Sequence, residues 1–168
     1  MNIFRNRLKS IGIAIIAICF SQSIFGATAT GTLGVAATIL TECIIAATPL
    51  AFGNYDPTSS TDLDTTATIS VTCTLAAAYN IGLDAGGGSG ASVTTRKMTR
   101  ALNTDTLNYG IYQNAGRSTV WGNTIGTNTV ASTGLGILQT FTAYGRAPAL
   151  QPQPAGGYAD TVNITVTY

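Results

Sequence analysis

The side chains best suited to chemistry after the N-terminal region are two cysteines, Cys43 and Cys73. The chain has no histidine, so these two thiols cannot complete the usual ligand set of a zinc site. In an oxidising compartment an even pair of cysteines favours one disulfide, with two buried free thiols as the alternative. Such a bond would close a loop of about 30 residues, worth roughly 3–4 kcal/mol in the chain-entropy model. The cysteines therefore point to a structural role.

The carboxylates do not assemble into a recognisable catalytic motif. Without histidine, the Ser-His-Asp and Cys-His arrangements and the commonest general base are excluded. Asp62 and Asp64 are the one close acidic pair, for which we expect a solvated turn, with a calcium contact as the alternative. The glycine run at residues 86–90 lacks the Gly-Lys-Ser/Thr ending of a phosphate-binding loop, and we expect a flexible loop there. We predict a protein that is not an enzyme, without catalytic residues, metal ligands or cofactors.

The N-terminal residues have the features of a secretory signal peptide. Three basic side chains within the first nine residues precede an uncharged apolar run, residues 11–20, that is too short to span a membrane. Small residues follow, and cleavage is plausible after Gly26 or after Ala29. We predict a signal peptide over residues 1–29, with a short membrane anchor as the alternative. Export would remove Cys19 and place the other two cysteines in an oxidising compartment.

Removal of the signal peptide changes the charge balance. The mature chain keeps five basic against seven acidic side chains, a net charge of −2. This is no electrostatic footprint for nucleic acid or an anionic membrane, and we expect no stable membrane insertion. No linker or composition shift interrupts residues 30–168, which are long enough for one domain with a core.

Apolar residues recur with a period of two, in stretches bounded by Gly, Asn, Asp and Pro. The clearest stretch is 66–74, where four apolar side chains from Ala67 to Cys73 alternate with Thr and Ser. Similar stretches occupy residues 31–40, 79–83, 97–102, 107–112, 134–144 and 160–168. About seven strands joined by short turns predict an all-β, antiparallel sandwich.

Several short segments follow one another in a specific order and spacing. They are TEC at 41–43, PLAFGNYDP at 49–57, ISVTC at 69–73, LNYGIY at 107–112, VWGN at 120–123, YGRAP at 144–148 and AGGYADTV at 155–162. Together they resemble the spore coat protein U (SCPU) domain, the fold of archaic (Csu-type) chaperone–usher pilin subunits, over essentially the whole mature chain. One departure is Ala147, where members of that family often carry a bulkier aliphatic residue.

The resemblance implies an immunoglobulin-like sandwich that is incomplete because it lacks its final strand. A periplasmic chaperone would first fill the resulting groove by lending a strand, which is a form of β-augmentation. At an outer-membrane usher, the N-terminal extension of an identical or related pilin subunit would replace the chaperone. Repetition of this step gives a head-to-tail polymer, an extracellular fibre (pilus) that would support adhesion or biofilm formation.

The resemblance also implies site residues. The donor strand would lie within residues 30–40, and its four groove-facing side chains would be Leu33, Val35, Ala37 and Ile39. The acceptor groove and chaperone-binding edge would be formed by Val162, Ile164, Val166 and Tyr168. In the alternative interpretation, both segments are ordinary strands of a complete sandwich.

Two further residues have mainly structural interpretations. Arg146 lies near a predicted turn, and we expect it to bond loop carbonyls or Asp160. Trp121 is expected in the core or as a loop anchor, although an exposed Trp could contact a surface or a glycan. Two other functions stay open: a self-assembling spore or cell-coat protein, and a monomeric secreted module that binds a glycan or a protein.

Overall fold

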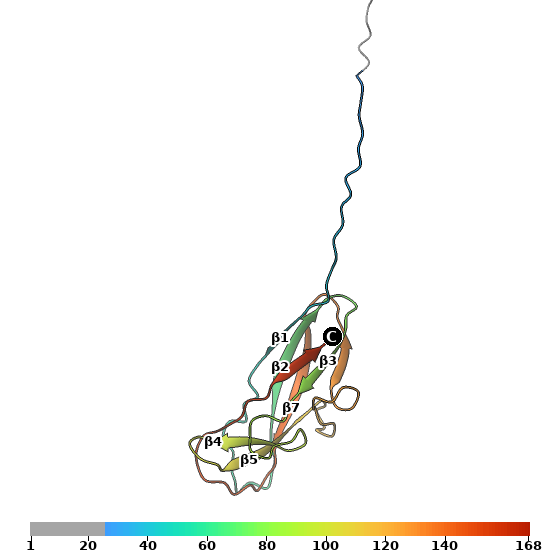
Figure 1. Cartoon of the computed structure of the whole chain (residues 1–168). Helices are drawn as coiled ribbons and strands as arrows, with labels where there is room; N and C mark the ends of the chain where they lie inside the picture. The colour runs from blue at the N-terminus through green and yellow to red at the C-terminus, as the bar shows by residue number, and fades with distance from the viewer. Residues whose placement is uncertain (1–25) are drawn as a thin grey trace, which may run out of the picture. The chain divides into compact units, whose positions relative to one another are not determined.

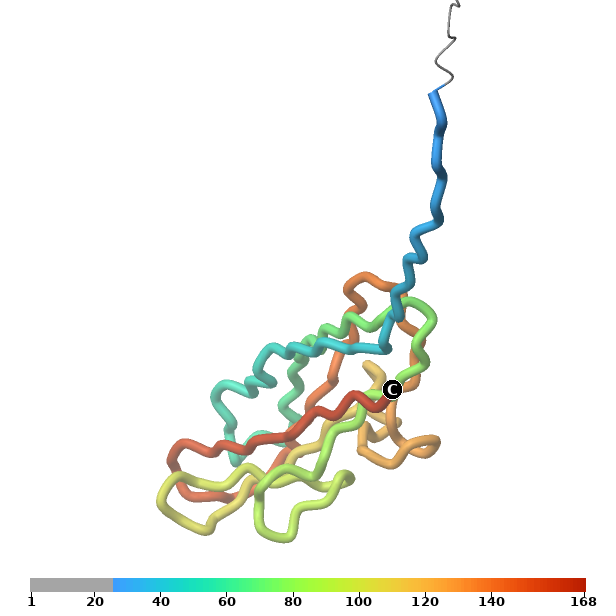
Figure 2. Tube along the Cα trace, turned by 45° about the horizontal axis from the view of Figure 1, so that its top comes forward, coloured from blue at the N-terminus to red at the C-terminus, as the bar shows by residue number. Residues whose placement is uncertain are grey.

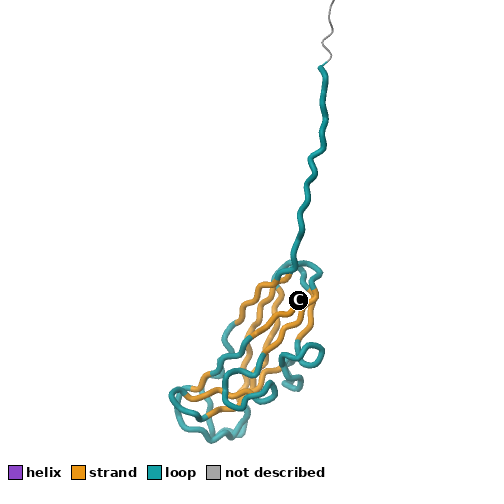
Figure 3. The backbone as a smooth tube through the Cα atoms, viewed as in Figure 1, coloured by secondary structure: helices purple, strands orange, loops and turns teal. Residues whose placement is uncertain are grey.

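The computed structural model describes residues 26–168, and every regular element in this part of the chain is a β-strand (Figure 1, Figure 3). Residues 38–168 form one compact unit that holds all these strands, whereas residues 26–37 belong to a separate unit. Most of the predicted signal peptide, residues 1–25, lies outside the described residues. No membrane-crossing helix is found within residues 26–168.

Two antiparallel sheets make up the sandwich, which confirms the predicted fold class. The six-stranded sheet has the order β1 (Cys43–Ala47), β2 (Leu63–Cys73), β7 (Gln139–Ala147), β5 (Thr106–Tyr112), β4 (Arg96–Arg100) and β8 (Tyr158–Ala159). The three-stranded sheet has the order β6 (Val130–Thr133), β3 (Ala78–Leu83) and β9 (Ile164–Thr167).

The core lies between the sheets and follows the period-two pattern of the strands. On β2, Ile69 and Val71 are buried, and they belong to one cluster with Ile81 of β3. Trp121, in the connection between β5 and β6, is buried too, and its Nε1 donates to the carbonyl of Ile81 at 2.9 Å. Trp121 is therefore a core residue that ties a connecting loop to the three-stranded sheet.

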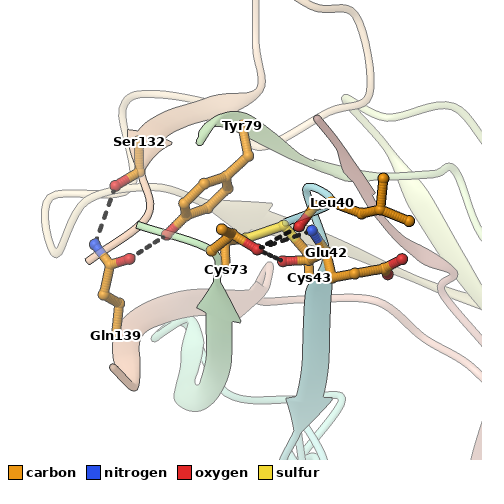
Figure 4. The surroundings of a disulfide bond; sticks show 8 residues. Leu40, Glu42, Cys43, Cys73, Tyr79, Ser132 and Gln139 are labelled. Carbon is orange, nitrogen blue, oxygen red and sulfur yellow. Dashed lines mark hydrogen bonds between the residues drawn. A yellow bond between two sulfur atoms is a disulfide. The ribbon is translucent and has the colours of Figure 1, made fainter. Parts of the chain in front are cut away.

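The predicted disulfide between Cys43 and Cys73 is present and joins β1 to β2, which are hydrogen-bonded neighbours (Figure 4). Beside it, the side chain of Thr74 accepts from the amide of Glu42 at 3.0 Å and contacts the carbonyl of Leu40 at 3.3 Å. The chain that enters β1 is therefore fixed to the end of β2 by a covalent bond and by hydrogen bonds.

Some predicted strand boundaries are wrong, and the reasons are local. The strand expected over residues 134–144 is a loop followed by β7. Gly134 donates to the carbonyl of Ala77, and Gly136 has a φ of 70°. The chain therefore turns here, before it pairs with β2. Strands β1, β6 and β8 were not predicted, β9 begins later than expected, and no strand is assigned between residues 31 and 40.

The acidic pair Asp62 and Asp64 does not form the expected solvated turn, because Asp64 lies in β2 directly opposite Arg146 of β7. The Nε and Nη2 atoms of Arg146 donate to the two carboxylate oxygens of Asp64 at 2.8 and 2.9 Å. This hydrogen bonding holds the pKa of Asp64 below its usual range. The expected partners of Arg146, loop carbonyls or Asp160, were therefore wrong. The pair is partly exposed, so we expect it to contribute at most about 1 kcal/mol.

Candidate functional site

Each of the two sheets has an edge strand with one open side: β1 in the six-stranded sheet and β9 in the three-stranded sheet. Within the part of the chain that the structure describes, β1 pairs only with β2, and β9 pairs only with β3. Figure 2 traces the red C-terminal segment along the sandwich into β9, where the chain ends. An unpaired strand edge presents free N–H and C=O groups that can template another strand.

A groove of about 1080 Å³, lined mainly by apolar residues, lies between the end of β1, at Ala47, and the start of β9, at Ile164. One wall is the segment after β1, with Leu50 and Phe52. The other is formed by Val162, in the segment that leads into β9, and by Ile164, the first residue of β9. The floor consists of buried side chains from four strands: Ile69 of β2, Leu83 of β3, Ile111 of β5 and Ala143 of β7. Core residues thus line a groove that opens to solvent.

The groove can take apolar side chains from an added strand. Burial of one Val, Leu or Ile side chain is worth roughly 1.5–3 kcal/mol relative to leaving it exposed. Alternate residues of a strand point to the same face, so a short period-two segment can place several such side chains in the groove. Its main chain would pair at the same time with an open edge.

Hydrogen bonds of two carboxylates fix the approach to β9. Asp84 accepts from the amide and the side-chain Nδ2 of Asn163, at 2.9 and 2.6 Å. Asp160 accepts from the hydroxyl of Tyr109 at 2.7 Å and from the amide of Gly87 at 2.7 Å. Burial, together with this hydrogen bond, raises the pKa of Tyr109, so the hydroxyl stays protonated and donates. The groove wall that precedes β9 is therefore held in place.

The glycine run that precedes β4 is less free than the sequence suggested. Gly86 has a φ of 78°, and a Cβ at this position would overlap the carboxylate of Asp160. Its amide donates to Asp84 at 2.9 Å. The first glycines of the run therefore serve as a docking point for the segment before β9, and the flexible loop expected over residues 86–90 stays a prediction.

Acid is expected to loosen this anchor. Burial acts to raise the pKa of Asp84, but hydrogen bonds from Asn163 and Gly86 outweigh it and leave the pKa below 3.8. A carboxyl whose pKa is depressed in the folded state stabilises the fold above its unfolded pKa, and this stability is lost as pH falls through the folded pKa. In unfolding titrations between about pH 5 and about pH 2.5, we expect a smaller loss of stability for Asp84→Asn than for the wild type. Equal slopes would show that Asp84 contributes nothing to acid sensitivity.

The predicted site residues occupy different places. Val162 and Ile164 line the groove, and Val166 packs against the core from β9. Tyr168 is 54% exposed and is not among the lining residues. The four predicted donor side chains are exposed, with Leu33 and Val35 at 89% and 87%. Their roles stay predictions.

Sequence reasoning missed the wall formed by residues 48–55. Leu50 and Phe52 pack against the core although the segment has no strand, and Phe52 meets the ring of Tyr109 edge-on at 5.9 Å. The alternation of Leu50 and Phe52 within PLAFGNYDP was the available signal.

Known proteins share both the sequence and the fold. The sequence profile of the Spore Coat Protein U domain matches residues 29–165. "Protein U" of Myxococcus xanthus is 36% identical over 181 residues, covering all of both chains. A chain of the crystal structure of the CsuC-CsuE chaperone–tip adhesion subunit pre-assembly complex, from archaic chaperone–usher Csu pili of Acinetobacter baumannii, has a TM-score of 0.57 at 21% identity. The match covers 78% of the present chain and 40% of that one, and it shows a shared fold. The chain belongs to the Spore Coat Protein U domain family.

Proposed function

We propose that this chain is a structural subunit of an extracellular bacterial fibre, a pilus, assembled by donor-strand exchange through a chaperone–usher pathway. The observation that carries the proposal is the open apolar groove beside the unpaired edge of β9. Membership of the Spore Coat Protein U domain family and the fold shared with a Csu pilus complex support it.

The donor in this proposal is the segment of residues 30–40 from a neighbouring copy. Leu33, Val35, Ala37 and Ile39 share one face of an extended chain and are exposed. Seated in the neighbour's groove, they replace contacts with water by contacts with buried side chains such as Leu83. The donor's main chain pairs with β9 and extends the three-stranded sheet.

Before assembly, a chaperone occupies the same groove. The solved structure with the shared fold is a complex of a chaperone with a tip adhesion subunit, which supports a chaperone as partner of the present chain. An outer-membrane usher then exchanges the chaperone for the next subunit, and the fibre reaches the cell surface. We propose adhesion or biofilm formation as its role.

Assembly without and with a chaperone tests this function. The exported chain produced alone is expected to aggregate or to form polymers, because its apolar groove is unoccupied. Co-expressed with a chaperone of the pathway, it should be recovered as a stable complex. Polymers should resist detergent until heated, and electron microscopy should show filaments. A soluble, folded monomer recovered in the absence of a chaperone would contradict the proposal and favour a secreted binding module.

The second candidate function is a self-assembling spore or cell-coat protein. It is favoured by the full-length identity of 36% with Protein U and by the description of the family. Such a protein would assemble without a dedicated chaperone and usher. Filament formation that requires both the chaperone and the usher would therefore favour the pilus subunit over the coat protein.

A further inference from the structure

Four exposed apolar side chains gather at the end of the sandwich that holds the disulfide. They are Leu75, in the turn between β2 and β3, and Leu135, Ile137 and Leu138, in the loop between β6 and β7, and their exposed fractions lie between 54% and 70%. We name them the disulfide-end patch. A contiguous group of exposed apolar side chains on a secreted domain indicates a contact surface.

Backbone hydrogen bonds hold the two loops of the disulfide-end patch together. The amide of Ala76 donates to the carbonyl of Gly134 at 2.8 Å, and the amide of Gly134 donates to Ala77 at 2.7 Å. The amide of Gly136 donates to the carbonyl of Cys73 at 3.1 Å. The patch is therefore a fixed part of the sandwich.

The N-terminal segment leaves the sandwich next to the disulfide-end patch. Leu40 and Glu42 bond to the side chain of Thr74, which immediately precedes Leu75 of the patch. The amide of Thr74 also donates to the carbonyl of Glu42 at 2.9 Å. The anchor of the segment and the patch thus share one end of the molecule.

The proposed donor strand leaves almost no linker between two copies. Its last groove-facing side chain, Ile39, directly precedes the anchored Leu40. An extended residue spans at most about 3.6 Å, so a neighbour that holds Ile39 in its groove lies against the disulfide end of the donor copy. Exposed apolar side chains on that end are then covered by the neighbour.

The orientation of the donor strand indicates which end of the neighbouring copy contacts the donor copy. Every strand pair of the two sheets is antiparallel, and a donor that continues this pattern along β9 leaves the groove where β9 begins. That end also carries the exposed apolar side chain of Leu102. It follows Ala101, whose amide donates to the carbonyl of the groove residue Gly157 at 3.0 Å.

We propose that the disulfide-end patch of one copy packs against the end of the next copy where β9 begins, as a second contact between subunits beside the donor strand. The contact rests on the proposed function, because the donor strand sets the distance between the copies. It is heterologous and repeats along the fibre. Its occupant is a second copy of this chain.

Thiol labelling of assembled fibres tests the contact. Ile137→Cys introduces a thiol into the disulfide-end patch, and Ile125→Cys is a matched control, because the two side chains are 64% and 55% exposed and Ile125 lies in another loop. In fibres of each exported variant, we expect maleimide to react with Ile137→Cys at least about tenfold more slowly than with Ile125→Cys. Leu135→Cys should be protected like Ile137→Cys, and wild-type fibres give the background.

The outcomes separate this contact from the function on which it rests. Detergent-resistant fibres with equal labelling of Ile137→Cys and Ile125→Cys would overturn the contact and leave the donor-strand mechanism standing; the patch would then face solvent on the fibre. Failure of the wild-type chain to form any fibre would overturn the function and this contact together.

Discussion

Deletion of residues 30–40 is expected to abolish fibre extension and to leave chaperone binding intact. The deletion removes the four side chains proposed to fill the neighbour's groove, whereas the groove residues Leu83 and Ile164 stay in place. In the proposed function, a chaperone would lend its own strand and would need only the groove. Co-purification with the chaperone measures the first property, and the ladder of detergent-resistant polymers measures the second.

A pair of single substitutions separates the donor face from the rest of this segment. Val35→Asp would bring a charge into an apolar groove without a partner, and burial of an unpaired charge costs several kcal/mol. We expect at least a hundredfold loss of polymer, which corresponds to about 2.7 kcal/mol. Ala36→Asp points to the opposite face of the extended chain and should assemble nearly as the wild type does.

The donor assignment is wrong if the deletion variant still polymerises. It is also wrong if Val35→Asp and Ala36→Asp assemble equally well, because a donor strand must be sensitive to the face on which the charge lies. A loss of chaperone binding in the deletion variant would indicate that residues 30–40 belong to the fold itself.

Alternation of apolar and polar residues predicted those strands in which the apolar face is the buried face. Strand β2 is the best example, since one face of it is buried and the other carries Thr and Ser. The disulfide followed from the cysteine count and the predicted compartment. By contrast, the loop at residues 134–138 carries three exposed apolar side chains, Leu135, Ile137 and Leu138. Only its hydrogen bonds to the turn after β2 explain its path. Periodicity carries no information on such partners.

The polar contacts could not be predicted, because they join residues far apart in the sequence. Arg146 meets Asp64 across 82 residues, and this pairing depends on the register between β7 and β2. The family resemblance predicted only one wall of the groove, the wall near β9. The opposite wall has no strand, and its period-two signal consists of Leu50 and Phe52 alone, which is too short to predict a strand.

Arg96 of β4 was not singled out in the sequence, although it is fully buried in the structure. Its Nε donates to the carbonyl of Asp84 at 2.8 Å, and its Nη1 donates to Val93 at 3.0 Å. Its Nη2 donates to the carbonyls of Leu83, at 3.0 Å, and Trp121, at 2.8 Å. One guanidinium thus joins a strand of the six-stranded sheet to the end of β3 in the three-stranded sheet.

Arg96→Met is expected to destabilise the domain by about 3–5 kcal/mol, a large part of the total stability of a domain of this size. Burial lowers the pKa of Arg96, but an arginine side chain keeps its proton in proteins, so the buried charge depends on these four carbonyls. Methionine fills similar volume but leaves the carbonyls without their donor, which is costly in a buried site. Guanidinium unfolding followed by the fluorescence of Trp121, the one tryptophan of the chain, measures the loss.

Arg146→Met is the matched control, because it removes the same group from a partly exposed ion pair with Asp64. It should cost at most about 1 kcal/mol when both variants are compared in the same state of assembly. Similar losses of unfolding free energy in the two variants would contradict the conclusion that the buried charge of Arg96 stabilises the domain more than an exposed ion pair does. A large difference would show that the carbonyls at the end of β3 need a buried cation. At this end of β3, Leu83 pairs with Ile164 of β9, and the amide of Asp84 donates to the carbonyl of Asn163 just before β9. The same cation therefore also steadies the strand edge that the proposed donor exchange would use.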